Sequence, residues 1–113
     1  MLVVNRFTVA EVDAPGFVDR ARSALRALSG CVGYQRGALH RALDEPETWC
    51  LTTEWESVGA YRRALGVFEV KVEATPLLAT AHDEPSAFEA LVTASPGMEP
   101  TTHTSDRAAA PGR

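Results

Sequence analysis

The sequence predicts an α+β fold with an antiparallel sheet, built in the ferredoxin-like order β-α-β-β-α-β. Two observations carry this prediction. First, strand-like segments alternate along the chain with helix-like segments. The strand-like segments have apolar residues at every second position, and the helix-like segments have them at helical spacing. The sharpest junction lies at 49–65 (WCLTTEWESVGAYRRAL), where a strand pattern passes through Ser57, a residue suited to capping a helix, into a helix pattern.

The composition indicates one globular domain. The chain has 113 residues, of which 45% are hydrophobic and 23% charged, and its formal net charge is −4. Because the sequence holds no Lys/Arg cluster, we expect no nucleic-acid partner. No apolar run reaches membrane-spanning length and no signal peptide follows Met1, so we expect no membrane partner and a location in the cytoplasm. Cys31 and Cys50 belong to no metal-ligand motif, and we expect both as reduced thiols.

The first two elements are a strand and a helix. Residues 2–10 (LVVNRFTVA) are β-branched and apolar, which is typical of a strand with two largely buried faces. Asn5 is its one carboxamide, and a buried carboxamide needs hydrogen-bond partners, from neighbouring backbone or from a ligand. Asp13 can cap a helix that has Pro15 in its first turn, and Gly30 is placed to end that helix in the left-handed conformation.

The middle of the chain predicts a β-hairpin. Residues 31–43 fit a bent strand or a helix, and Gly33 and Gly37 favour a strand with a bulge. The turn at 44–47 (DEPE) joins this strand to the one that starts at Trp49. With a loop of two or four residues, six side chains would share the face of the hairpin that lines the pocket: Tyr34, Arg36, His40, Leu51, Thr53 and Trp55. A three-residue loop or a bulge would invert this parity.

The last third of the chain is less regular. Residues 67–76 fit a strand and a short helix about equally well, and residues 77–85 read as a loop. Residues 86–93 alternate like a final strand. Residues 94–113 are rich in Pro, Ala and Thr without periodicity, so we expect a domain at 1–93 followed by a flexible tail.

Several of these stretches resemble a known family. The run TEWES followed by AYRRAL, with SGCVGYQ before the second strand and VVNRFTV at the start, resembles the antibiotic biosynthesis monooxygenase domain over residues 1–93. The resemblance implies a homodimer in which two ferredoxin-like sheets close an α+β barrel, with a pocket between the sheet and the helices of each subunit. It also favours a helix at 67–74.

The resemblance further implies a chemistry. One branch of the family oxidises phenolic or quinol-type aromatic molecules without a cofactor, since the ionised substrate itself passes an electron to O₂ in a dry cavity with hydrogen-bond donors. The pocket Trp and Tyr of that branch match Trp55 and Tyr61, while its strand Asn is Leu51 here and no arginine matches its late helical Arg. The predicted catalytic residues are Tyr61 and Asn5, as hydrogen-bond donors, and His40, as a base. The predicted substrate-binding residues are Trp55, Arg36, Leu51, Thr53 and Tyr34.

Two other functions stay open. Leu51, in place of a donor, favours a binding module or accessory dimer that kept the pocket and lost the chemistry. The haem-degrading branch of the family has an Asn that matches Asn5. Its Trp falls on Ala64 and its iron-ligating His falls near Glu73, which argues against haem. The predictions therefore include no cofactor and no metal ligand.

Overall fold

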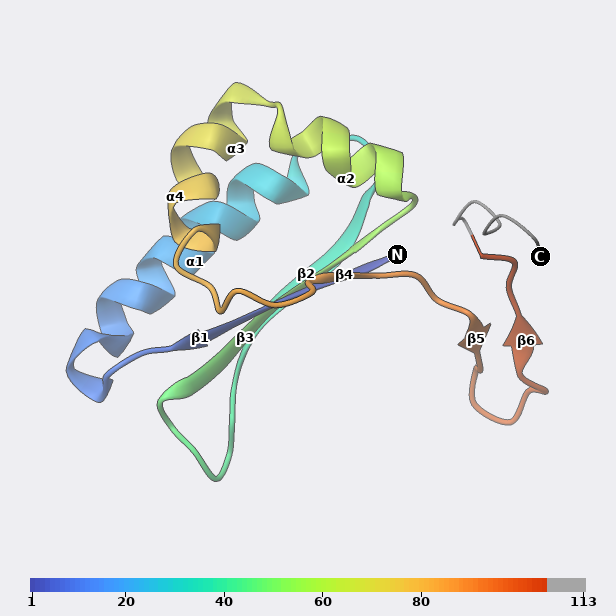
Figure 1. Ribbon diagram of the computed structural model, residues 1–113, viewed down its shortest axis with the longest axis horizontal. Helices are drawn as coiled ribbons and strands as arrows, with labels where there is room; N and C mark the ends of the chain where they lie inside the picture. Colours follow the sequence, from blue (N-terminus) through green and yellow to red (C-terminus); the bar gives the residue numbers. More distant parts are fainter. Residues whose placement is uncertain (106–113) are drawn as a thin grey trace.

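The computed structural model of the chain describes residues 1–105 (Figure 1). Its elements are, in order, β1 (Leu2–Thr8), the 3-10 turn η1 (Glu11–Asp13), α1 (Ala14–Ser29), β2 (Tyr34–Arg41), β3 (Thr48–Trp55), α2 (Val58–Leu65), α3 (Phe68–Glu73), α4 (Thr75–Leu78), β4 (Ala87–Phe88), β5 (Val92–Thr93) and β6 (Thr101–Thr102). Strands β1 to β4 form an antiparallel sheet in the order β2-β3-β1-β4. The predicted α+β class and ferredoxin-like order are confirmed.

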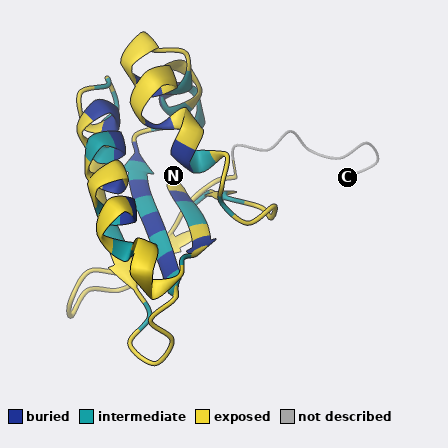
Figure 2. Ribbon diagram, turned by 90° about the vertical axis from the view of Figure 1, so that its left-hand side faces the viewer, coloured by how far each residue is buried: buried dark blue, intermediate teal, exposed yellow. Residues whose placement is uncertain are grey.

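All four helices lie on one face of this sheet (Figure 1), and the buried side chains form a layer between them and the strands (Figure 2). Alternation along β3 turns every second side chain toward the helices, as its burial shows. The helices meet this layer largely through small side chains: Ala21, Ala24, Ala27, Ala60, Ala64 and Ala74. Because alanine adds little bulk, α1 and α2 can pack closely against the sheet.

The helix ends are partly as predicted. Ser57 caps α2, since its Oγ accepts a hydrogen bond from the backbone N–H of Ala60 at 3.1 Å. The left-handed end predicted at Gly30 is wrong: Gly30 has a φ of −82°, and the turn out of α1 continues until Gly33, whose φ is +89°. The chain therefore reverses direction immediately before β2 rather than at the helix end.

The β2–β3 hairpin forms, but the predicted register is wrong by one residue. Leu39, not His40, lies opposite Leu51. The loop explains the shift, because the backbone N–H of Ala42 donates to the carbonyl of Thr48, leaving residues 43–47 as a loop of odd length. An odd loop inverts the parity on which the prediction rested.

A bulge then corrects one position. Between Tyr34 and Arg36 the register shifts again, so Tyr34 lies opposite Trp55 on the helix-facing side. Arg36 lies opposite Glu54 and His40 lies opposite Cys50, both on the side away from the helices. The prediction that Arg36 and His40 share a face with Trp55 is therefore wrong.

The C-terminal third contains more structure than its pattern predicts. The expected loop at 77–85 begins with the end of α4, and the single expected strand at 86–93 is split between β4, which pairs with β1, and β5. Strand β5 pairs with β6 to form a hairpin that stands apart from the helices (Figure 1). The predicted boundary at 93 and the flexibility of the tail stay predictions, and residues 106–113 lie outside the described residues.

Two further sequence predictions can be compared with residues 1–105. None of their helices has both the length and the apolar composition of a membrane span, while a cytoplasmic location stays a prediction. Cys31 and Cys50 are both free thiols, as predicted.

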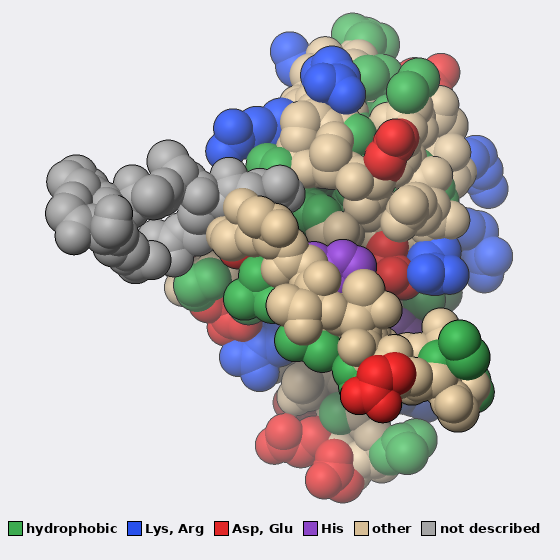
Figure 3. Space-filling view, turned by 90° about the vertical axis from the view of Figure 1, so that its right-hand side faces the viewer, with side chains coloured by type: hydrophobic (Ala, Val, Ile, Leu, Met, Phe, Trp, Pro, Cys, Tyr) green, Lys and Arg blue, Asp and Glu red, His purple; other side chains and the backbone are tan. Residues whose placement is uncertain are grey.

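On the side that carries the β5–β6 hairpin, basic and acidic side chains are interspersed rather than gathered into one basic patch (Figure 3).

Candidate functional site

Three aromatic side chains meet at the end of β3. Trp55 is completely buried, and its indole ring contacts the ring of Tyr34 from β2, with centroids 5.3 Å apart and planes at 87°. The indole also contacts the ring of Tyr61 from α2, with centroids 5.5 Å apart and planes at 53°. Edge-to-face and tilted contacts of this kind stabilise aromatic clusters. The structure thus brings together three of the predicted site residues, hereafter the aromatic trio.

Backbone hydrogen bonds hold Trp55 in this position. Its N–H donates to the carbonyl of Met1 at 2.9 Å, and the Met1 ammonium donates to the carbonyl of Trp55 at 3.1 Å. The following residue, Glu56, donates its N–H to the carbonyl of Gly33 at 2.8 Å. The indole Nε1 donates to the Oγ1 of Thr53 at 2.8 Å, and Thr53 is itself buried. These hydrogen bonds fix the strand end and the orientation of the indole ring.

Burial sets the protonation state of the two phenols. It raises the pKa of the Tyr61 hydroxyl above its ordinary value, because a phenolate is poorly solvated there. The same cause raises the pKa of Tyr34. Both side chains therefore stay neutral at physiological pH, and each can donate a hydrogen bond to a ligand oxygen.

Asn5 lies two rows from Trp55 on the same side of the sheet, with the row of Val3 and Thr53 between them. It is opposite Leu51 on the neighbouring strand, and Leu51 is opposite Leu39. Asn5 is half-buried, and its carboxamide makes no hydrogen bond within residues 1–105. An amide without a protein partner can donate to a ligand oxygen, whereas Leu51 beside it offers only apolar surface.

The two site residues on the other face belong to different contacts. Arg36 forms an exposed ion pair with Glu54. His40 is exposed, and its Nε2 lies 3.4 Å from the Oγ1 of Thr52. An exposed ion pair adds little stability, and neither side chain can reach a ligand on the helix-facing side of the sheet.

The sequence profile of the antibiotic biosynthesis monooxygenase family matches residues 1–71. The chain belongs to this family. No curated protein matches it. Membership supports a monooxygenase-like function.

Solved structures share the fold. SnoaB, a cofactor-independent oxygenase from Streptomyces nogalater, has a TM-score of 0.62 and 24% identity, covering 95% of this chain and 93% of its own. A protein from Mycobacterium tuberculosis has a TM-score of 0.65 and 15% identity, covering 83% and 97%. A conserved protein from Methanosarcina mazei Go1 has a TM-score of 0.62 and 20% identity, covering 76% and 84%. At these identities the likeness shows the fold.

The haem alternative for this family member can be tested on the residues present. The positions implied for the haem-site Trp and His are Ala64, which is buried, and Glu73, which is exposed. Among residues 1–105, His40 lies on the outer face, His82 contacts Thr8, and His103 contacts Thr93. The same residues hold no group of three or more metal-ligating side chains. These residues do not fit an axially ligated haem.

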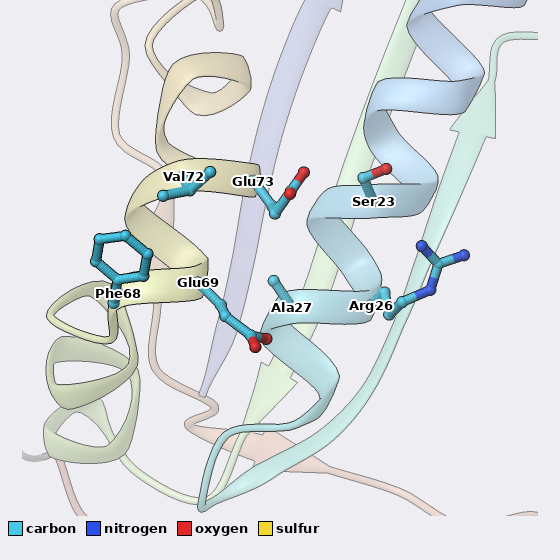
Figure 4. A pocket seen from close by; sticks show the side chains of 7 residues that line it. All are labelled: Ser23, Arg26, Ala27, Phe68, Glu69, Val72 and Glu73. Atoms are coloured by element: carbon cyan, nitrogen blue, oxygen red, sulfur yellow. The ribbon is translucent and has the colours of Figure 1, made fainter.

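Two cavities show where small molecules could approach. A groove of about 320 Å³ lies between α1 and α3, where Glu69 and Glu73 point toward α1 while Phe68 points away (Figure 4). A second cavity, of about 290 Å³, reaches Trp55 from the side of the C-terminal hairpin. Its lining includes Met1, Gln35, Glu56, Ser57 and His103. This second cavity adjoins the aromatic trio, and the groove does not.

From the sequence, Gly37 was predicted only to favour a strand with a bulge. In the structure Gly37 lies opposite Thr53 on the helix-facing side, and the hydroxyl of Tyr34 lies where a Cβ atom of a larger residue would come too close. The available signal is a glycine in a strand interior, which often marks the close approach of another group.

The second aromatic cluster, of Phe7, Phe17 and Trp49, lies in the core away from the trio, with Arg41 over the Trp49 ring.

Proposed function

We propose that this family member is a cofactor-independent monooxygenase that oxidises a phenolic or quinol-type aromatic molecule beside Trp55. The observation that carries the proposal is the aromatic trio with the free carboxamide of Asn5 on the same side of the sheet. Family membership supports the reaction class. The trio supports the substrate class, because a flat ring packs well against indole and phenol rings.

The proposed reaction needs only the substrate and O₂. The ionised ring gives one electron to O₂, the two radicals combine into a hydroperoxide, and loss of water leaves a new carbonyl on the ring. One oxygen atom enters the product and the other leaves as water with two hydrogen atoms of the substrate, so all four electrons taken up by O₂ come from the substrate. The protein needs to bind the ring, exclude water and stabilise the negative charge on the ring oxygen.

The residues on the helix-facing side divide this work. Trp55 contacts the ring, and the neutral hydroxyl of Tyr61 donates to the ring oxygen, where negative charge is held. The amide of Asn5 donates to a second oxygen. Leu51 supplies an apolar wall, and the buried Thr53 holds the indole through its hydroxyl. His40 and Arg36 have no part in this proposal, because they lie on the other face of the sheet.

Oxygen uptake tests the proposed reaction. We expect the purified protein to consume O₂ when supplied with an anthrone or a quinol, with one O₂ taken up for each molecule oxidised, measured with an oxygen electrode and by product chromatography. Protein treated with EDTA should be equally active, since the reaction uses no metal. Uptake that disappears after this treatment would contradict a cofactor-independent mechanism.

A second candidate is a binding module of the same fold without chemistry. Leu51 favours it, because an apolar side chain stands beside Asn5 where the oxygenase branch of the family has a donor. The two functions are separated by one comparison. A binding module would quench Trp55 fluorescence with a phenolic ligand yet consume no O₂.

We also propose that the protein acts as a homodimer. The sheet face opposite the helices is not covered by any other element of residues 1–105 (Figure 1), although it carries the half-buried side chains Val4, Ala38, Cys50 and Thr52. A second copy placed on this face would remove that surface from water. Small domains gain stability from such burial.

Light scattering checks the dimer. We expect a mass of twice the monomer at micromolar concentration, and we expect Ala38→Glu to yield monomers because it places a charge in the apolar part of the interface. Arg22→Glu, which adds negative charge on the exposed side of α1, is the matched control and should stay dimeric. A monomeric wild-type protein would contradict the proposal.

A further inference from the structure

Tyr34 fills a space whose end is formed by Gly37. A Cβ atom added to Gly37 would lie 2.6 Å from the Tyr34 hydroxyl oxygen, 3.0 Å from Cδ2 of Leu25 and 3.0 Å from the carbonyl oxygen of Thr52. A methyl group at this position would require the Tyr34 hydroxyl to move, and Leu25 and the Thr52 carbonyl to give way slightly. The Tyr34 side chain therefore extends from its contact with the Trp55 ring to Gly37, between β2 and α1.

This space has the shape and chemistry of a phenol site. Trp55 and Leu25 supply apolar walls for a ring, and the backbone around Gly37 leaves room for a hydroxyl at the far end. The Tyr34 hydroxyl forms no hydrogen bond within residues 1–105. Displacing the Tyr34 ring by a phenolic ligand therefore breaks no hydrogen bond between the Tyr34 hydroxyl and the protein.

The cavity beside the C-terminal hairpin borders Trp55, but the Trp55 side chain is completely buried. A ligand ring can therefore pack against the indole only if a neighbouring ring gives way. Tyr61 is on a helix that Ser57 caps at its start. Tyr34 is half-buried on β2, which is at the edge of the sheet. It follows Gly33 and precedes the bulge, where Gln35 has no partner on β3. Tyr34 is therefore the ring with the fewest constraints.

We propose that the space bounded by Trp55, Leu25 and Gly37 is a binding slot for a phenol ring, filled in this structure by the chain's own Tyr34. An incoming phenolic molecule displaces the Tyr34 ring and takes its place against Trp55. This proposal rests on the proposed function only in its choice of a phenolic molecule as the ligand. Its binding step needs neither O₂ nor turnover.

The test uses p-cresol, which has the ring and hydroxyl of the tyrosine side chain, in oxygen-free buffer. A Trp49→Phe background leaves Trp55 as the one tryptophan, so its fluorescence reports binding. In this background Tyr34→Ala empties the slot, and we expect p-cresol to bind about tenfold more tightly than to the parent, because no ring competes for the space. Tyr34→Phe keeps a competing ring and should bind as weakly as the parent.

Two further comparisons keep the result specific. Adding Gly37→Ala to Tyr34→Ala places a methyl group in the slot, and we expect the gain in p-cresol affinity to be lost. Cyclohexanol, which lacks a flat ring, should bind Tyr34→Ala less well than p-cresol. Should Tyr34→Ala fail to fold, Tyr34→Val serves in its place.

Equal p-cresol affinity in Tyr34→Ala and Tyr34→Phe would overturn the slot. An unchanged gain after Gly37→Ala would do the same. Because these measurements exclude O₂, a protein that binds p-cresol in this way but consumes no O₂ supports the slot while rejecting the oxygenase. A protein that oxidises quinols without a gain in Tyr34→Ala keeps the oxygenase and rejects the slot.

Discussion

Replacing Tyr61 by phenylalanine should lower the rate of O₂ uptake by about 10²-fold, the usual cost of losing one donor to a developing oxyanion. The ring contact with Trp55 is kept, since phenylalanine has the same ring. Substrate affinity should change much less than turnover, because the lost hydrogen bond is strongest where negative charge is greatest. The measurement is the steady-state rate with an anthrone, with substrate affinity from Trp55 quenching under nitrogen.

The pH profile gives this prediction a second readout. Burial raises the pKa of Tyr61 above its ordinary value of 10.0, so the hydroxyl remains a donor throughout the range in which phenolic substrates ionise. The wild-type rate should therefore rise with pH as the substrate ionises, without a fall below pH 10 that comes from Tyr61. A Tyr61→Phe protein with wild-type turnover and an unchanged thermal midpoint would remove Tyr61 from the reaction.

The two strongest sequence signals were both local. The alternation from Trp49 to Trp55 and the cap at Ser57 together place a strand, a turn and a helix, and the structure contains all three. A helix at 67–74 could not be decided from spacing, because its apolar residues fit either period, and the family resemblance favoured the element that forms α3. The β5–β6 hairpin has two-residue strands, which are too short for any periodicity to show.

The site depended on parity, which is not a local property. Loop length and bulges each shift the face on which every later side chain lies. The odd loop moved Arg36 and His40 to the outer face, whereas the bulge after Tyr34 inverted the parity a second time and returned Tyr34 to Trp55. The family resemblance implied that Trp55 and Tyr61 share a site, and the two rings meet in the structure across the short connection that Ser57 caps.

The trio also contributes to the stability of the fold, and Trp55→Ala should lower the free energy of unfolding by about 3–5 kcal/mol. Trp55 is the largest side chain with no exposed surface, so its loss leaves a cavity bordered by Tyr34 and Tyr61. Urea denaturation at one fixed protein concentration measures the change, because dimerisation would make the apparent stability depend on concentration. A loss below about 1 kcal/mol would show that the helices close over the gap.

A double substitution separates the packing of Trp55 from its hydrogen bond. Trp55→Phe keeps a ring but leaves the buried Oγ1 of Thr53 without its donor, at a cost of about 1–3 kcal/mol for the unpaired hydroxyl beyond the loss of ring volume. Adding Thr53→Val removes the hydroxyl as well, so the double variant should be more stable than Trp55→Phe alone. Thr53→Val by itself should destabilise the protein, because the indole N–H then has no acceptor. If the double variant lost the sum of the two single changes, the Trp55–Thr53 hydrogen bond would add nothing to stability, and the indole would be held by packing and by the Met1 backbone bonds.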